Sequence, residues 1–329
     1  MHRPRAFQIR SRIVAAGVSL ALLAPTVLPA QTISNEDLYL KSLLAAVQSV
    51  EQYGVYDKPE ERERDNRIGY ELAARSGFDK YPFTFTLIDM PIPNAFALPA
   101  GQIFVTRGML DLGLDDEMLA ALLGHEIAHV TEEHFLRMKK KATLLNTLSS
   151  LLIAGALYGA SPGSDDTYVG PYGITRDDDN AAALAQGAIQ ASMLATELLM
   201  RGYSRDHEDE SDEMGQRYMA LAGFDPDGAR RLMATMSERM PQTESYGYLH
   251  THPFLNDRAA AAQARKGGFK IEESQPADDY RRQTQLLLLD FVERRREGTG
   301  KPLEEAVVAH LESTALVIWP QGPDADRLR

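Results

Sequence analysis

The sequence predicts an α+β fold that is predominantly helical and contains a small antiparallel sheet. Most of the chain places apolar residues at helical spacing, whereas the stretch 83–106 alternates apolar and polar residues as strands do. The length of 329 residues and the charged fraction of 25% suit one sizeable globular domain with extensions better than a disordered chain.

Residues 1–30 look like a secretory signal peptide. Four arginines lead into the apolar run 13–23, and the small residue Ala30 precedes a polar one. Cleavage there predicts an exported protein that resides in the periplasm. An uncut membrane anchor formed by the same segment is the alternative.

Cysteine content and charge restrict the chemistry. The chain has no cysteine, so any metal must be held by histidines and carboxylates. Without the four arginines of 1–30, 31 basic residues face 47 acidic ones, a formal charge of −16. This charge argues against nucleic acid as a partner.

Helices and strands are predicted ahead of the central motif. Apolar periodicity predicts a helix over 35–56 and a second one around 68–75, after a charged stretch. Strands are expected over 83–88, 94–98 and 102–106, the last two joined by the turn Pro99-Ala100-Gly101.

The run His125-Glu126-Ile127-Ala128-His129 is the most informative stretch. Asp115 or Asp116 can cap the helix that contains it, and on a helix the two imidazoles lie one turn apart. This spacing predicts zinc bound by His125 and His129, with Glu126 as general base. Zinc lowers the pKa of a bound water to about 7, so Glu126 can take its proton for attack on a peptide carbonyl.

A third ligand is expected far downstream. Catalytic zinc usually has three protein ligands and one open position. A metzincin would need Gly and His where this chain has Glu132 and Phe135, which excludes that class. Glu208, followed one turn later by Asp212, fits a gluzincin: Glu208 reaches the metal, and Asp212 accepts the outer N–H of a ligating imidazole.

Three neighbouring residues are weaker candidates. His207 and Glu210 compete with Glu208, but neither has an Asp four residues later. His134 lies five residues after His129, so it does not share the face of His129 squarely on a helix. We expect His134 to be an outer or structural residue rather than a ligand.

Four separated blocks share a pattern with a known family. They are NAFALPAGQIFVTRG (94–108), GHEIAH (124–129), SRDHEDESD (204–212) and Thr251-His252-Pro253 with Arg258. Together they resemble the HtpX and CAAX-prenyl-protease family of zinc metallopeptidases, in its soluble, exported, BepA-like bacterial branch. The resemblance implies a zincin-like catalytic domain over 31–265 that binds one zinc ion per chain. Where the family usually has Ala before the last Asp of the third block, this chain has Ser211.

The resemblance implies a site role for His252. As a catalytic residue it would stabilise the tetrahedral intermediate, a role for which Tyr203 is the other candidate. Alternatively, His252 closes the fourth zinc position and keeps the enzyme latent. The sequence leaves both roles open.

The first block contains the predicted substrate-binding residues. Metallopeptidases commonly bind substrate as an added strand on a sheet edge, because main-chain hydrogen bonds hold any sequence in extended form. We therefore expect Asn94, Ala95, Phe96 and Ala97 to bind substrate. An ordinary core hairpin is the competing interpretation.

Two segments lie outside the motif pattern. Residues 266–329 predict a C-terminal helical extension with helices over 278–296 and 302–316. The segment 143–160 is nearly uncharged and only 18 residues long, which favours a buried or interface helix over a peripheral membrane contact.

The function expected from the sequence is a zinc-dependent endopeptidase that hydrolyses misfolded or unassembled envelope proteins. Its expected partners are such unfolded substrates and the outer-membrane assembly machinery. The alternative is an assembly factor or chaperone for outer-membrane proteins whose zinc site is latent.

Overall fold

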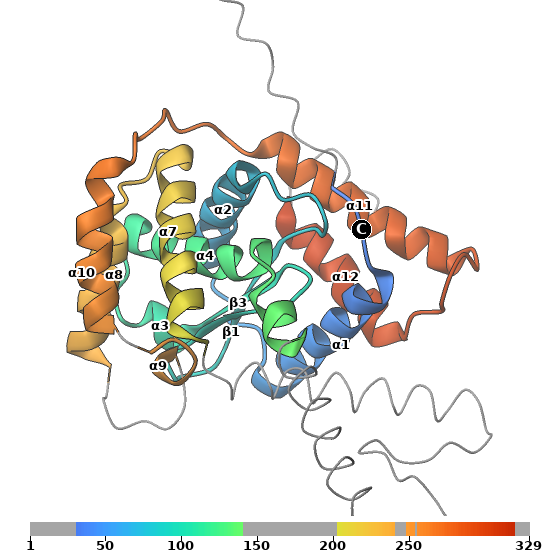
Figure 1. Cartoon of the computed structure of the whole chain (residues 1–329). Helices are drawn as coiled ribbons and strands as arrows, with labels where there is room; N and C mark the ends of the chain where they lie inside the picture. Colours follow the sequence, from blue (N-terminus) through green and yellow to red (C-terminus); the bar gives the residue numbers. More distant parts are fainter. Residues whose placement is uncertain (1–30, 141–202, 241–247, 254, 320–329) are drawn as a thin grey trace, which may run out of the picture.

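The computed structural model describes residues 31–140, 203–240, 248–253 and 255–319. The predicted signal peptide and the segment 143–160 lie outside these residues. Within them, helices pack around one three-stranded sheet (Figure 1), so the predicted α+β, predominantly helical fold class is confirmed. No helix in the described ranges has the length and hydropathy needed to cross a membrane.

Helices α1 (Glu36–Tyr53) and α2 (Pro59–Ser76) begin the described chain. The side chain of Asn35 caps α1 by accepting from the Leu38 amide at 3.0 Å. Helix α2 begins at Pro59 rather than near residue 68 as predicted. Its proline start and acidic first turn favour a helix N-terminus, which the low apolar content of 58–67 concealed.

The sheet consists of β1 (Thr84–Ile88), β2 (Ala95–Ala97) and β3 (Gln102–Thr106) in the order β1-β3-β2. Strands β2 and β3 form an antiparallel hairpin, but β1 pairs parallel with β3, so the sheet is mixed rather than antiparallel. The pairing is parallel because the chain reverses twice between β1 and β3, once over 89–94 and once at the turn Pro99-Ala100-Gly101. Two reversals return β3 to the direction of β1.

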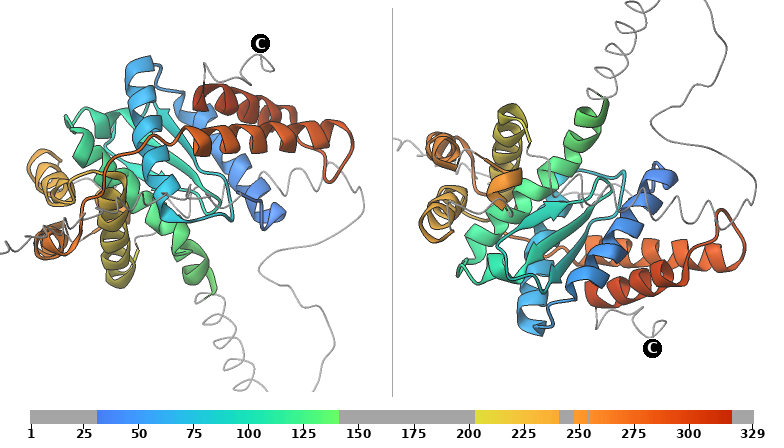
Figure 2. Two further views of the ribbon diagram at one scale, coloured as in Figure 1. Left: turned by 90° about the horizontal axis from the view of Figure 1, so that it is seen from above. Right: turned by 90° about the horizontal axis from the view of Figure 1, so that it is seen from below.

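Both faces of the sheet are buried. Phe85 of β1 packs edge-on against Tyr70 of α2, with ring centroids 5.0 Å apart. On the opposite face, Phe96 and Phe104 stack at 4.9 Å and join a cluster with Ala45 of α1. The view from above looks onto α2, and the view from below looks onto the sheet and α1 (Figure 2). The sheet therefore provides a fixed platform between helices.

The next helices pack against this platform or on one another. They are α3 (Arg107–Leu110), α4 (Asp116–Thr131), α7 (Arg205–Ala222), α8 (Asp227–Arg239), α9 (Tyr248–Thr251) and α10 (Leu255–Arg265), followed by the 3₁₀ turn η1 (Lys266–Gly268). Asp115 caps α4 by accepting from the Met118 amide at 2.9 Å. Every residue of α4 from Met118 to Val130 is buried, because α2, α7 and α8 all pack against it.

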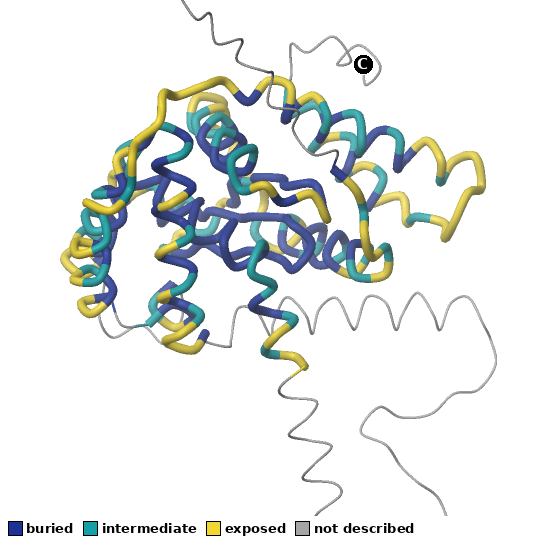
Figure 3. The backbone as a smooth tube through the Cα atoms, turned by 45° about the horizontal axis from the view of Figure 1, so that its top comes forward, coloured by how far each residue is buried: buried dark blue, intermediate teal, exposed yellow. Residues whose placement is uncertain are grey.

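Helices α11 (Asp278–Arg296) and α12 (Glu305–Ile318) form the C-terminal pair, close to the two predicted helices. The Phe291 ring meets Tyr39 of α1 edge-on at 5.4 Å, and Arg281 pairs with Glu63 of α2 at 3.1 Å. Buried residues run through the sheet and central helices, whereas exposed ones lie at the periphery, the turn between α11 and α12 among them (Figure 3). The pair thus packs on the first two helices, away from α7 and α10.

Candidate metal centre

Helix α4 carries the two histidines of the HExxH run. They lie one turn apart on the same face, and both are buried. Their Nε2 atoms are 3.0 Å apart, so both rings direct the same nitrogen to one point. This is the geometry that the sequence spacing predicts for a metal site.

Helix α7 supplies a carboxylate to the same point. Ser204 caps this helix, and Glu208 lies in its first turn. Its Oε1 is 3.5 Å from His129 Nε2, and its Oε2 is 3.6 Å from His125 Nε2. Burial acts to raise the pKa of Glu208, but the charges of His252, Arg258 and His125 outweigh it and hold that pKa well below its usual value.

These donor atoms fit a small metal ion. One donor atom from each of His125, His129, Glu208 and His252 lies within 4.8 Å of all the others. Tetrahedral zinc with ligands at about 2.0–2.1 Å separates neighbouring donors by about 3.3 Å. The observed separations of 3.0–3.6 Å bracket that value.

Asp212 occupies the position expected for a partner of a ligating imidazole. His125 Nδ1 donates to Asp212 Oδ1 at 2.9 Å, which leaves Nε2 of His125 to bind a metal. Burial acts to raise the pKa of Asp212, but the charge and hydrogen bonds of Arg258 outweigh it and keep that pKa below the usual value.

Arg258 is a site residue whose role the sequence did not reveal. It is buried on α10, and its Nε and Nη2 donate to the two oxygens of Asp212, both at 2.8 Å. It also forms an ion pair with Glu208. Its presence in the fourth sequence block was the available signal, but only the fold shows that it joins two buried carboxylates.

His252 lies among the donors. Its Nδ1 is 3.2 Å from His125 Nε2 and 3.0 Å from Glu208 Oε1, and its ring stacks on Tyr248 at 4.3 Å. Burial acts to lower the pKa of His252, but the carboxylates of Glu208 and Glu126 outweigh it and raise that pKa above its usual value. His252 therefore stands at the position of a fourth donor.

Glu126 lies beside the donors without joining them. Its Oε1 is 3.5 Å from His252 Nε2, and this oxygen accepts no hydrogen bond from any residue that the structure describes. Burial raises the pKa of Glu126 above its usual value. A buried carboxylate with a free oxygen next to a metal position can take a proton from water there.

The rings of His129 and His134 complete the buried cluster. The Tyr203 ring stacks on His129 with centroids 3.9 Å apart. His134 contacts His129 through their Nδ1 atoms, at 2.9 Å. Burial lowers the pKa of His134 to about 4, so its ring is neutral near pH 7. As the sequence suggested, His134 is outside the donor group.

The two competitors of Glu208 lie outside the donor group as well. Glu210 is half-buried, and it accepts from His134 Nε2 at 3.0 Å and from Arg137 at 2.8 Å. The His207 ring stacks on His134 at 4.5 Å. Both side chains face the outer side of the cluster.

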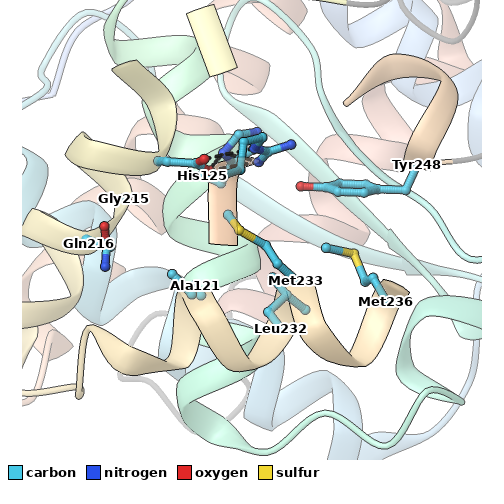
Figure 4. A pocket seen from close by; sticks show the side chains of 11 residues that line it. Ala121, His125, Gly215, Gln216, Leu232, Met233, Met236 and Tyr248 are labelled. Carbon is cyan, nitrogen blue, oxygen red and sulfur yellow. Dashed lines mark hydrogen bonds and ion pairs between the residues drawn. The ribbon is translucent and has the colours of Figure 1, made fainter. Parts of the chain in front are cut away.

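A small pocket with apolar and charged side chains in its lining lies behind His125. Met233 and Met236 of α8 face this ring, and the hydroxyl of Tyr248 points toward it (Figure 4). The pocket is also lined by Asp212 and Arg258. Apolar packing behind a ligand limits access of water to the buried side of the site.

The predicted substrate strand lies next to the motif helix. Residues 95–97 form β2, one of the two outer strands of the sheet, which contacts α4 directly. Asn94 precedes it, and its backbone carbonyl accepts from Thr106 N at 3.0 Å. Asn94 and all three residues of β2 are buried in this structure.

Comparisons with known proteins agree with this geometry. Residues 59–266 match the description "Peptidase family M48". A beta-barrel assembly-enhancing protease from Escherichia coli (strain K12) is 24% identical over 220 residues, which cover 65% of this chain and 41% of that protein. A mitochondrial metalloendopeptidase OMA1 from Schizosaccharomyces pombe is 27% identical over 220 residues, with 67% and 54% covered.

A mammalian relative is similar over a shorter stretch. Metalloendopeptidase OMA1 from Bos taurus is 34% identical over 181 residues, 54% of this chain and 29% of that protein. The chain thus spans about half the length of these relatives or less. The family resemblance inferred from the four sequence blocks is confirmed. The chain belongs to Peptidase family M48, as a metallopeptidase that resembles the beta-barrel assembly-enhancing proteases.

Proposed function

We propose that the chain is a zinc-dependent endopeptidase whose metal ligands are His125, His129 and Glu208. One observation carries the proposal. If the outer Nδ1 atom of each histidine holds the ring proton, three unprotonated acceptors converge within 3.6 Å of one another: two Nε2 atoms and a carboxylate. Such lone pairs repel unless a cation lies among them. Nitrogen and oxygen donors at these separations suit one zinc ion per chain.

Glu126 is the proposed general base. When bound, zinc lowers the pKa of water to about 7 and polarises the peptide carbonyl. The free Oε1 of Glu126 takes the proton from water and returns it to the leaving amine. Burial raises the pKa of Glu126, which makes the carboxylate a better proton acceptor.

Asn94, Ala95, Phe96 and Ala97 are the proposed substrate-binding residues. Strand β2 is the outer strand that lies against the motif helix α4, so a peptide added beside it would run close to Glu126. Since these residues are buried here, binding requires the edge to open. Edge pairing favours unfolded segments, because a folded protein has no free strand to add.

Misfolded or unassembled envelope proteins are the proposed substrates. The relatives named beta-barrel assembly-enhancing proteases support this choice, together with an outer-membrane assembly machinery as partner. We also propose that residues 1–30 export the chain to the periplasm.

A second candidate function is that of an assembly factor with a latent metal site. His252 favours it, because its Nδ1 lies 3.0 Å from Glu208 Oε1 and stands where a fourth ligand would be. A zinc ion with four protein ligands has no open position for water. On this proposal, the conformation described here is the closed form of the site.

The test is cleavage of unfolded casein by zinc-loaded protein and by Glu126→Gln. We expect cleavage by the wild type and a loss of at least about 100-fold in the variant. The same comparison is repeated with His252→Ala added to the wild type and to Glu126→Gln, so that a latent site is not mistaken for an inactive one. Equal cleavage with and without Glu126 contradicts its role. No cleavage in any background, with zinc bound, supports the assembly factor instead.

A further inference from the structure

His129 has a second partner on the side of its ring away from the donor cluster. Its Nδ1 lies 2.9 Å from Nδ1 of His134, and Nε2 of His134 lies 3.0 Å from Glu210 Oε2. His134 is fully buried, whereas Glu210 is half-buried and also accepts from Arg137. The three side chains form a connected row, the His129–His134–Glu210 chain, from the metal site to the surface.

A break in the helix brings His134 into this row. Helix α4 ends at Thr131, Glu133 has φ 52°, and residues 134–140 are helical again. In an unbroken helix, five residues rotate about 140° around the axis, so position 134 would point away from His129. The left-handed conformation of Glu133 costs about 1–2 kcal/mol for a residue with a Cβ. That local strain is what places His134 beside His129.

The proton positions follow from the two ends of the row. A His129 ring that binds metal through Nε2 carries its proton on Nδ1, so Nδ1 donates to His134 Nδ1. His134 must then carry its own proton on Nε2, where it donates to the carboxylate of Glu210. The opposite tautomer of His134 would direct a lone pair at that carboxylate. Glu210 therefore selects the tautomer that can accept from His129.

Ser211 adds a contact at the same nitrogen. Its hydroxyl is buried 3.1 Å from His134 Nδ1, and it shares the single lone pair of that nitrogen with His129. A hydroxyl that donates there also requires Nδ1 to be unprotonated. Ser211, which stands where the family usually has Ala in the third sequence block, is thus in direct contact with the His129–His134–Glu210 chain.

We propose that His134 and Glu210 are positioning residues that fix the ring of His129 and place a carboxylate behind it. Asp212 has the same relation to His125, but directly, at 2.9 Å. The inference rests on the proposed metal site. A carboxylate behind a ligating imidazole fixes its orientation and increases its basicity, so losing it weakens metal binding.

The test compares zinc affinity among variants of the full chain, measured by competition with a chelator. His134→Phe keeps a flat ring without nitrogen atoms, and we expect zinc affinity to fall about 10–100-fold. His134→Gln should recover most of that loss, because its amide oxygen can accept from His129 while its amide nitrogen donates to Glu210.

A charge-matched pair on α7 provides the control. Glu210→Gln should weaken zinc binding about 3–10-fold, because the amide no longer selects the tautomer of His134. Asp209→Asn removes the same charge from an exposed carboxyl next to it and should change the affinity by less than about twofold. Equal affinities for these two variants overturn the inference.

The remaining outcomes are also decisive. If His134 has only a structural role, the folded variants His134→Phe and His134→Gln should bind zinc equally. That result would contradict the proposal. If His134→Phe does not fold, the zinc affinities of Glu210→Gln and Asp209→Asn test the proposal instead. Wild-type protein that binds one zinc but cleaves no peptide contradicts the proposed function and leaves this result valid. Wild-type protein that binds no zinc overturns both.

Discussion

Gly124 of α4 and Gly215 of α7 touch backbone to backbone. A Cβ built on Gly215 would lie 3.0 Å from the carbonyl carbon of Gly124 and 3.0 Å from the amide nitrogen of His125. Because His125 and Glu208 lie on these two helices, this contact sets the distance between the metal donors. The two glycines are therefore part of the geometry of the site.

Substitution of Gly215 by Ala should separate the helices and weaken the site. Neighbouring backbone has to move to make room, so we expect a loss of about 1–3 kcal/mol in unfolding free energy and about tenfold weaker zinc binding. Gly267→Ala is the control, since a Cβ there meets nothing within 4 Å. Urea unfolding and chelator competition measure both effects. A Gly215→Ala protein that binds zinc like the control contradicts this account of the helix contact.

Removal of the His252 side chain should activate the peptidase. If His252 closes the fourth metal position, His252→Ala opens it to water, and we expect casein cleavage to rise several-fold with zinc content unchanged. His250→Ala, a substitution of the exposed histidine two residues earlier, should cleave like the wild type. A loss of activity in His252→Ala, with zinc retained, would instead assign His252 to the transition state.

Arg258 should be essential for the stability of the metal-free protein. It joins Glu208 and Asp212, and all three side chains are buried. Arg258→Met leaves two carboxylates without their cation, and we expect a loss of about 3–5 kcal/mol in unfolding free energy. Zinc should restore part of it by neutralising Glu208, whereas Arg258→Lys should lose less because it keeps the charge. Urea unfolding with and without zinc tests this, and wild-type stability of metal-free Arg258→Met contradicts it.

Asp65 should make the protein less stable as the pH rises. This residue of α2 is fully buried, and neither carboxylate oxygen has a hydrogen-bond partner in the described part of the chain. Burial raises the pKa of Asp65 to about 7. In the unfolded chain the pKa is about 3.9, so between these values only the folded state holds the proton.

The sign of the effect follows from that difference. The raised pKa stabilises the fold below about pH 4, and this contribution is lost at about 1.4 kcal/mol per pH unit as the pH rises toward 7. Asp65→Asn should flatten this dependence and be the more stable protein at pH 8. The control is Glu60→Gln, an exposed carboxyl on the same helix. Urea unfolding at pH 5 to 8 measures how the unfolding free energy depends on pH. An equal pH dependence for Asp65→Asn and wild type contradicts the prediction.

The sequence predicted the parts of the site that depend on helical periodicity. The HExxH spacing and the four-residue step from Glu208 to Asp212 each place two side chains on one helix face, so local structure alone relates them. Contacts between segments far apart in the chain were not accessible in this way. Arg258 reaches Asp212 only because α10 packs beside α7.

Local exceptions to regular structure account for the other differences. His134 contacts His129 because Glu133 breaks the helix with a positive φ. A glutamate in the sequence does not predict such a conformation. The polar start of α2 lacks an apolar stripe, so periodicity missed it. The parallel pairing of β1 depends on how many times the chain reverses, which the alternation of residues does not encode.

The central claim is that α4 and α7 together hold one zinc ion. Zinc content per chain, measured on purified wild-type protein, Glu208→Ala and Asp209→Ala, tests it most directly. We predict one zinc ion in the wild type and in Asp209→Ala, and a nearly complete loss in Glu208→Ala, because a site with two histidines alone lacks the third ligand of catalytic zinc. A Glu208→Ala protein that keeps one zinc ion per chain would contradict the claim.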